Sequence, residues 1–117
     1  PAAIDANARV LGQWLDQLGR ETPLVLTGDF NADKRSAAYY LLTSEGRLQD
    51  AYAAVHPADP AAATFHGFGQ AAPPTAIDWI LVSVHFRVQD AWIDRARQGG
   101  LYPSDHYPLV ALIDWQD

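Results

Sequence analysis

The sequence predicts a mixed α/β (α+β) domain in which helices and sheets form separate layers. Helical periodicity dominates the first part of the chain, and short apolar runs typical of buried strands dominate the rest. The 117 residues, 49% hydrophobic and 19% charged, fit one small globular domain or a part of a larger one. Because helices come early and strands late, this order favours a layered sandwich over a parallel doubly wound fold.

Two helices are predicted. Apolar side chains recur at helical spacing over residues 3–18 and form one stripe: Ile4, Ala8, Leu11, Leu15 and Leu18. Gly19 is a natural end for this helix. Ser36 is a suitable N-cap for a shorter helix that runs to about Ser44 and is closed by Gly46.

Four strands are predicted from apolar runs, at residues 24–27, 77–83, 86–93 and 109–113. A long connection rich in Pro and Ala covers residues 56–76, and residues 64–66 have the composition of a short strand within it. Residues 98–103 form a loop that leads into Ser104-Asp105-His106. Polar residues therefore gather where buried strands begin and end.

Charge and composition narrow the partners. The net charge of -6, with no Lys/Arg cluster, argues against a protein that grips long duplex nucleic acid and mildly favours a small phosphorylated substrate. No apolar run reaches the roughly 18–20 residues of a membrane span. Without cysteine, any metal must be held by Asp, Asn, Glu or His, a ligand set that suits Mg²⁺, Mn²⁺ or Ca²⁺. No leader is visible, but the chain opens on Pro1, so the compartment stays open.

One carboxylate, Asp78, lies in the otherwise apolar run from Ile77 to Ser83. An ionised carboxylate in such a strand is costly unless it is paired, hydrogen-bonded or bound to a cation. A structural pair with an arginine or with backbone N–H groups would satisfy it as well as a functional partner would.

Asp105 and His106 come just before another buried strand. Such residues often serve only as a turn and a polar cap, but a carboxylate that orients an imidazole also tunes a general acid or base. If Asp78 and His106 lie on adjacent strands, Asp78 can accept from one ring nitrogen while the other faces a substrate. Asp105, pointing elsewhere, is then free to bind a metal or a metal-bound water.

Asp29 and Asn31 lie where the first strand passes into a loop. In an extended segment, that spacing places both side chains on one face. A carboxylate beside an amide can orient a water and stabilise charge on a phosphoryl oxygen. The alternative is an Asx-turn that ends the strand.

Taken together and in order, these stretches resemble motifs of the endonuclease/exonuclease/phosphatase superfamily, which includes deoxyribonuclease I, sphingomyelinases and inositol polyphosphate phosphatases. Residues 28–31 resemble its GDFN element, residues 77–83 its IDYILVS strand, and residues 104–109 its SDHYP element. Residues 64–68 resemble the TFHGF stretch of bacterial members described as metal-dependent hydrolases. The helix at 3–18 also fits the family's helix before GDFN.

The resemblance implies four catalytic residues. Asp29 would position or deprotonate the attacking water, and Asn31 would bind the scissile phosphate or the metal. Asp78 would orient His106, which would contact the phosphate and transfer a proton.

The resemblance also implies a divalent metal, Mg²⁺ or Mn²⁺, held by Asp105, Asp29 and Asn31. The metal would polarise the phosphoryl oxygen and steady the leaving group. His66, taken as an exposed residue, is a further candidate for contact with the substrate.

The sequence departs from the family pattern in two ways. Ala76 stands where family members often carry an arginine. Residues 1–117 also match only the C-terminal half of one four-layer αββα sandwich, whose N-terminal half carries a metal-binding glutamate. Glu21 and Glu45, the only glutamates, lie in the wrong context. We therefore expect the missing half, a second chain or a second copy to cover an exposed apolar face, and the chain alone to be inactive.

The sequence thus predicts a metal-dependent phosphoester hydrolase (a phosphodiesterase, nuclease or phosphatase) in its complete form. The alternative is a non-catalytic binding or interaction module derived from the same fold. The substrate class and the oligomeric state remain open at this stage.

Overall fold

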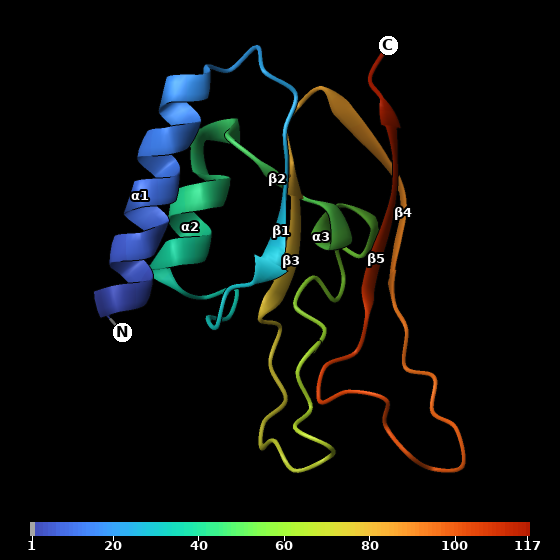
Figure 1. Ribbon diagram of the computed structural model, residues 1–117. Coiled ribbons are helices and arrows are strands. Elements are labelled where there is room, and N and C mark those ends of the chain that lie inside the picture. The colour runs from blue at the N-terminus through green and yellow to red at the C-terminus, as the bar shows by residue number, and fades with distance from the viewer. Residues whose placement is uncertain (1) are drawn as a thin grey trace.

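Two helices cover one face of a small sheet, and a second, two-stranded sheet lies beside it (Figure 1). The computed structural model describes residues 2–117. The helices are α1 (Ala2–Leu18), α2 (Ala37–Thr43) and α3 (Ala51–Val55), with a 3₁₀ turn, η1, at Ser44–Gly46. The strands are β1 (Val25–Asp29), β2 (Gln49–Asp50), β3 (Asp78–Val82), β4 (Phe86–Ile93) and β5 (Leu109–Trp115).

Every strand pair among the described residues is antiparallel. The first sheet has the order β1-β3-β2, and β4 pairs with β5 in the second. In the β1–β3 register the last residue of β1, Asp29, lies opposite the first residue of β3, Asp78. The register thus brings the two carboxylates to one end of the sheet.

The main core lies between α1, α2 and the three-stranded sheet. Its buried members are Ala8, Leu15, Ala38, Leu42, Leu48, Trp79 and Leu81. The Trp79 ring stacks on Phe30 with centroids 4.3 Å apart and meets the edge of Tyr39 at 5.0 Å. Its Nε1 donates to the carbonyl oxygen of Ala76 at 2.9 Å, which satisfies the one polar atom of the ring. The strand that carries Asp78 is therefore anchored at the very next residue.

Two elements that the sequence analysis did not predict, β2 and α3, meet at Asp50. Its carboxylate caps α3 by accepting from the backbone N–H of Ala53, and it also accepts from the hydroxyl of Tyr39 at 2.6 Å. Lys34 lies 2.8 Å from the same carboxylate, and both side chains are buried. Burial and the bond to Asp50 raise the pKa of Tyr39, so its hydroxyl stays protonated and donates. Burial of both charges makes this pair costly to break on one side only.

The predicted helices and strands are otherwise found close to their predicted places. The Ser36 hydroxyl accepts from the N–H of Tyr39, as an N-cap should, and β5 runs on to Trp115. The predicted strand at 64–66 is wrong as a regular element, because only Phe65 makes isolated bridges, to Thr75 and to His106. None of the helices in residues 2–117 combines the length and apolarity needed to cross a bilayer.

Replacing Trp79 by alanine should lower the free energy of unfolding by about 3–5 kcal/mol, because the ring is 1% exposed and its removal leaves a cavity. Denaturant unfolding of a protein that contains this chain measures the loss. Trp14→Ala is the matched control: this ring on α1 is 57% exposed, and its loss should cost less than about 1 kcal/mol. Equal losses in the two variants would contradict this account of the core.

Candidate functional site

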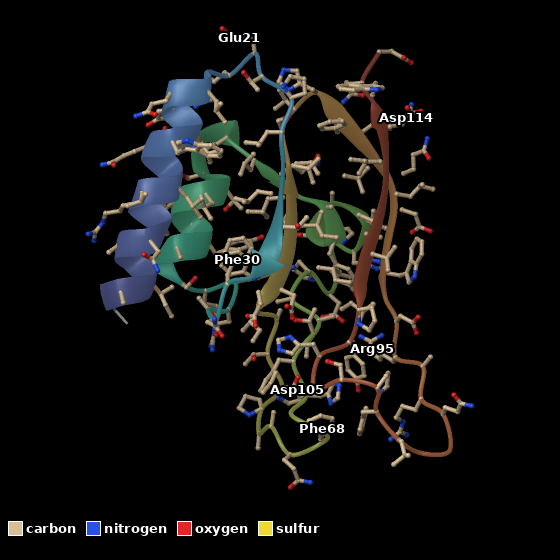
Figure 2. All side chains as sticks on the ribbon, viewed as in Figure 1. Glu21, Phe30, Phe68, Arg95, Asp105 and Asp114 are labelled. Atoms are coloured by element: carbon tan, nitrogen blue, oxygen red, sulfur yellow. The ribbon has the colours of Figure 1, made fainter. Side chains whose placement is uncertain are left out.

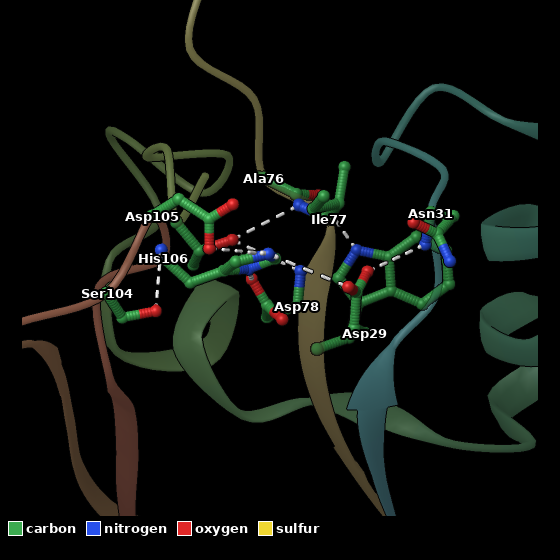
Figure 3. Close-up of polar contacts among 10 residues, drawn as sticks. Asp29, Asn31, Ala76, Ile77, Asp78, Ser104, Asp105 and His106 are labelled. Atoms are coloured by element: carbon green, nitrogen blue, oxygen red, sulfur yellow. Dashed lines mark hydrogen bonds and ion pairs between the residues drawn. The ribbon is translucent and has the colours of Figure 1, made fainter. Parts of the chain in front are cut away.

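A hydrogen bond joins His106 to Asp78, with Nδ1 of the imidazole 2.7 Å from Oδ2 of the carboxylate (Figure 3). An ionised carboxylate can only accept, so Nδ1 carries the proton and donates it. The other ring nitrogen, Nε2, is then left for a second partner. Asp78 thus accepts from one ring nitrogen of His106, as predicted for residues on adjacent strands. However, β3, which carries Asp78, and β5, which follows His106, belong to separate sheets.

Thr64 fixes the position of Asp78. Its hydroxyl accepts from the backbone N–H groups of Ile77 and Asp78 at 3.2 and 3.1 Å, and the residue is 2% exposed. Its carbonyl oxygen accepts from the N–H of Tyr107 at 2.7 Å. One buried threonine thus holds both the strand that carries Asp78 and the segment that carries His106.

Phe65, the next residue, packs its ring edge-on to the His106 imidazole with centroids 5.1 Å apart. Sequence reasoning overlooked Thr64 and Phe65. Among residues 64–68, the sequence predicts a functional role only for His66. A threonine directly before an aromatic residue in a Pro-rich connection was the available signal.

Asp29 brings a second carboxylate to His106, with Oδ2 3.7 Å from Nε2. Its other oxygen, Oδ1, accepts from the backbone N–H of Asn31 at 3.0 Å. Asn31 has a φ of 53°, in the left-handed region, so the chain turns here instead of continuing as a strand. The expectation that Asp29 and Asn31 share one face is therefore wrong, and the Asx-turn is the arrangement present. In Figure 3, Asn31 lies beyond Asp29 as seen from His106.

Asp105 places a third carboxylate near the same ring nitrogen, with Oδ1 3.9 Å from Nε2. Its carbonyl oxygen accepts from the N–H groups of His66 and Gly67 at 3.0 and 3.1 Å. The sequence analysis expected Asp105 to point away from the imidazole, and this is wrong. The backbone pairing with 66–67 aims its side chain back toward His106 (Figure 3).

The electrostatic environment of His106 favours its charged form. The hydrogen bond to Asp78 raises the pKa of His106, partial burial works against this, and the charges of Asp78, Asp29 and Asp105 raise the pKa further. A negatively charged ligand would meet a donor here, and a cation would meet carboxylate oxygens.

Ligand atoms of Asp29, Asp78 and His106 lie within 4.8 Å of one another, close enough to converge on one ion. Asp78 gives Oδ2 to Nδ1 of His106, whereas carboxylate oxygens of Asp29 and Asp105 lie near Nε2 on the other side of the ring. Oxygen donors of this kind fit a hard divalent cation. The cluster opens into a hollow of about 540 Å³ whose lining includes Asp29, Asp78, His106, Tyr107 and Ile80.

Other residues singled out from the sequence lie away from this cluster. His66 is not exposed as expected: it is 4% exposed, and its ring lies against those of Tyr102 and Tyr107. Ala76 is buried, so it presents no polar side chain to the hollow. Glu21 lies at the opposite end of the molecule from Asp105 (Figure 2).

Comparison with known proteins identifies the family of this chain. The profile of the Endonuclease/Exonuclease/phosphatase family matches residues 2–106. None of the curated proteins matches the chain in sequence.

Several solved structures are similar. An endonuclease/exonuclease/phosphatase from Bacteroides vulgatus is 29% identical, with a TM-score of 0.78 over 98% of this chain and 45% of its own. A mannosyl-6-phosphatase from Bacteroides thetaiotaomicron is 26% identical, with a TM-score of 0.73 over 98% of this chain and 47% of its own. The catalytic domain of human Nocturnin, solved with a bound sulfate, is 28% identical, with a TM-score of 0.74 over 97% of this chain and 41% of its own.

The chain thus spans a little under half the length of these structures. The profile match extends over most of the sequence and includes the segments that carry Asp29, Asp78 and His106. The chain belongs to the endonuclease/exonuclease/phosphatase family.

Proposed function

We propose that this chain forms part of a metal-dependent phosphoester hydrolase in which Asp29, Asp78, Asp105 and His106 carry the chemistry. The observation that supports this most directly is the position of His106. One ring nitrogen donates to Asp78 at 2.7 Å, and the other lies within 4 Å of the carboxylates of Asp29 and Asp105. Such an imidazole is oriented, and its raised pKa favours the protonated form that can donate.

His106 and Asp29 divide the proton transfers. The protonated Nε2 of His106 donates to an oxygen of the phosphoryl group, while Asp78 stabilises the imidazolium from the other side. Asp29 keeps Oδ2 free for the attacking water, since its Oδ1 is engaged by the N–H of Asn31. In this proposal Asn31 acts through Asp29, by holding that carboxylate in one rotamer with its backbone N–H.

Asp29 and Asp105 would hold Mg²⁺ or Mn²⁺, because an oxygen of each carboxylate lies within 4 Å of Nε2, the ring nitrogen that faces the substrate in this proposal. When bound, the cation polarises the phosphoryl oxygen and offsets the negative charge that the three carboxylates place around one imidazole. The similar mannosyl-6-phosphatase and the sulfate-bound Nocturnin domain support a site for tetrahedral anions.

The described glutamates do not complete this site. Glu45 belongs to the turn η1, where its carbonyl lies 3.5 Å from Arg20, and Glu21 lies at the end of the molecule opposite Asp105. We propose that a further segment of the protein, or a second chain, supplies the remaining ligand and covers the open hollow between β1, β3 and β5.

Replacing His106 by alanine should reduce phosphate-ester hydrolysis by roughly 100-fold or more, the usual effect of removing a general acid or base. The assay uses the full-length protein that contains this chain, with Mg²⁺. His85→Ala is a matched control, because His85 bonds Ser83 just beyond β3, at the end away from Asp78. Undiminished activity in His106→Ala would rule out the mechanism.

Removal of divalent cations should abolish that hydrolysis, and Mg²⁺ or Mn²⁺ should restore it, because the carboxylates need a cation to accept an anionic substrate. The measurement is activity after treatment with a chelator and after addition of each metal. Hydrolysis that continues in the chelator would favour a metal-free mechanism. Absence of hydrolysis under every condition would instead favour a non-catalytic binding module.

Replacing Asp78 by asparagine should lower the pKa of His106, because the largest cause of its elevation is lost. In the wild type, the bond between Asp78 and protonated His106 stabilises the fold. While Asp78 is ionised, this stabilisation is fully present below the unfolded histidine pKa of about 6.5. It is lost as the pH rises through the pKa of His106 in the folded state, which is higher. NMR titration of His106 in a chelator measures the shift. Asp114→Asn, paired with Arg87 elsewhere, is the control. An unchanged titration in Asp78→Asn would refute the assigned pairing.

A further inference from the structure

The rings of His66, Tyr102 and Tyr107 pack together next to the Ser104–His106 segment. The His66 imidazole lies 4.2 Å from the Tyr102 ring and 4.3 Å from the Tyr107 ring, measured between centroids. Both of its ring nitrogens are buried and have no hydrogen-bond partner among the described residues. The Tyr102 and Tyr107 centroids are themselves only 6.3 Å apart, so the three rings pack against one another as a cluster. These tyrosines flank the segment that carries Asp105 and His106.

Two arginines lie against the same tyrosines. The Arg95 guanidinium carbon is 5.7 Å from the Tyr107 ring centroid, and that of Arg97 is 4.8 Å from the Tyr102 centroid. Neither arginine forms an ion pair within residues 2–117, whereas Lys34, Arg35, Arg47 and Arg87 each pair with an aspartate. A guanidinium held against an aromatic ring keeps its N–H groups available at the edge, where they bind phosphate in a fork.

These arginines belong to the loop between β4 and β5, at the end of the molecule that carries Asp105. Figure 2 shows Arg95, Asp105 and Phe68 together there. Tyr107, the ring beside Arg95, also lines the hollow that contains His106. Arg97, Gln98 and Tyr102 line a further cavity of about 780 Å³, with Ala96, Leu101 and Pro103. Tyr107 thus links the hollow at His106 to Arg95, and the contact between the Tyr102 and Tyr107 rings, with centroids 6.3 Å apart, links it to Arg97.

Charge makes this position unusual. The chain carries a net charge of -6, and three carboxylates surround His106. Two cations without acidic partners beside this cluster attract anionic groups that the carboxylates repel. Within residues 2–117, neither Arg95 nor Arg97 forms an ion pair that would account for its position.

We propose that Arg95 and Arg97 form a second anion subsite, so that the preferred substrate carries another phosphoryl group besides the scissile one. This inference rests on the proposed function, because it assumes that hydrolysis occurs at His106. A sugar bisphosphate and a 5′-phosphorylated nucleotide would both present the required chemistry. Arg95 and Arg97 are thus assigned to substrate specificity, and Tyr102, Tyr107 and His66 to the positioning of those two side chains.

The test compares two pairs of substrates with the full-length protein. One pair is a hexose 6-phosphate and the hexose 1,6-bisphosphate; the other is a dinucleotide with and without a 5′-phosphate. We expect kcat/KM to be at least roughly tenfold higher for the member with the additional phosphate in one of the pairs, as is usual for a charge-assisted contact. The pair that shows the preference identifies the source of the second phosphate.

The variant Arg95→Ala/Arg97→Ala should lose this preference, mainly through a higher KM, and should hydrolyse the member without the additional phosphate as before. Arg95→Lys/Arg97→Lys should retain part of the preference, because it keeps the charge and loses the fork. Arg87→Ala is the matched control, since Arg87 lies at the far end of β4 and pairs with Asp114.

The outcomes separate the two proposals. Hydrolysis without a preference in either pair, or a preference that survives in the double alanine variant, would overturn the subsite while leaving the phosphoesterase intact. Hydrolysis of none of the four compounds, with Mg²⁺ or Mn²⁺ present, would count against the proposed function, and the subsite would fall with it.

Discussion

The hydrogen bond between His106 and Asp78 is the interaction on which the site depends. It joins residues that are 28 positions apart in sequence: Asp78 begins β3, and His106 lies in the segment before β5, which belongs to the other sheet. A charge-assisted bond of this kind is stronger than a neutral one, and it leaves only one ring nitrogen free. Because that nitrogen faces Asp29 and Asp105, a single interaction determines which atoms of the site remain available for a substrate.

Two buried residues, Trp79 and Thr64, hold the backbone on either side of this bond. Trp79 anchors β3 in the main core immediately after Asp78, through its stacking on Phe30 and its bond to Ala76. Thr64 holds the backbone at Asp78 and also the backbone at Tyr107. Since both sides of the bond are tied to the same buried threonine, their separation cannot change without disrupting hydrogen bonds that Thr64 makes to the backbone on each side.

The carboxylates around His106 lie in a chain that spans a little under half the length of the similar structures. The carboxylates of Asp29 and Asp105 lie beside one imidazole, and no lysine or arginine within residues 2–117 pairs with them. The hollow is open, and the relatives of this family extend to about twice the length of this chain. Both features are consistent with a site that is finished by additional protein.

The main layers and the candidate site residues could be predicted from the sequence alone. An apolar stripe is enough to define α1, because helical periodicity is a local property, and apolar runs likewise locate β3, β4 and β5. Asp78 and His106 could be named because a carboxylate in an apolar strand needs a partner.

The contacts among these residues could not be predicted, because they depend on the tertiary structure. The helix α3 is too short to be seen from periodicity and depends on the buried contact between Asp50 and Lys34, which are distant in sequence. The direction of the Asp105 side chain depends on backbone hydrogen bonds between Asp105 and residues 66–67, which are distant in sequence. Spacing along the chain cannot reveal such contacts, because they form only once separate segments have packed together.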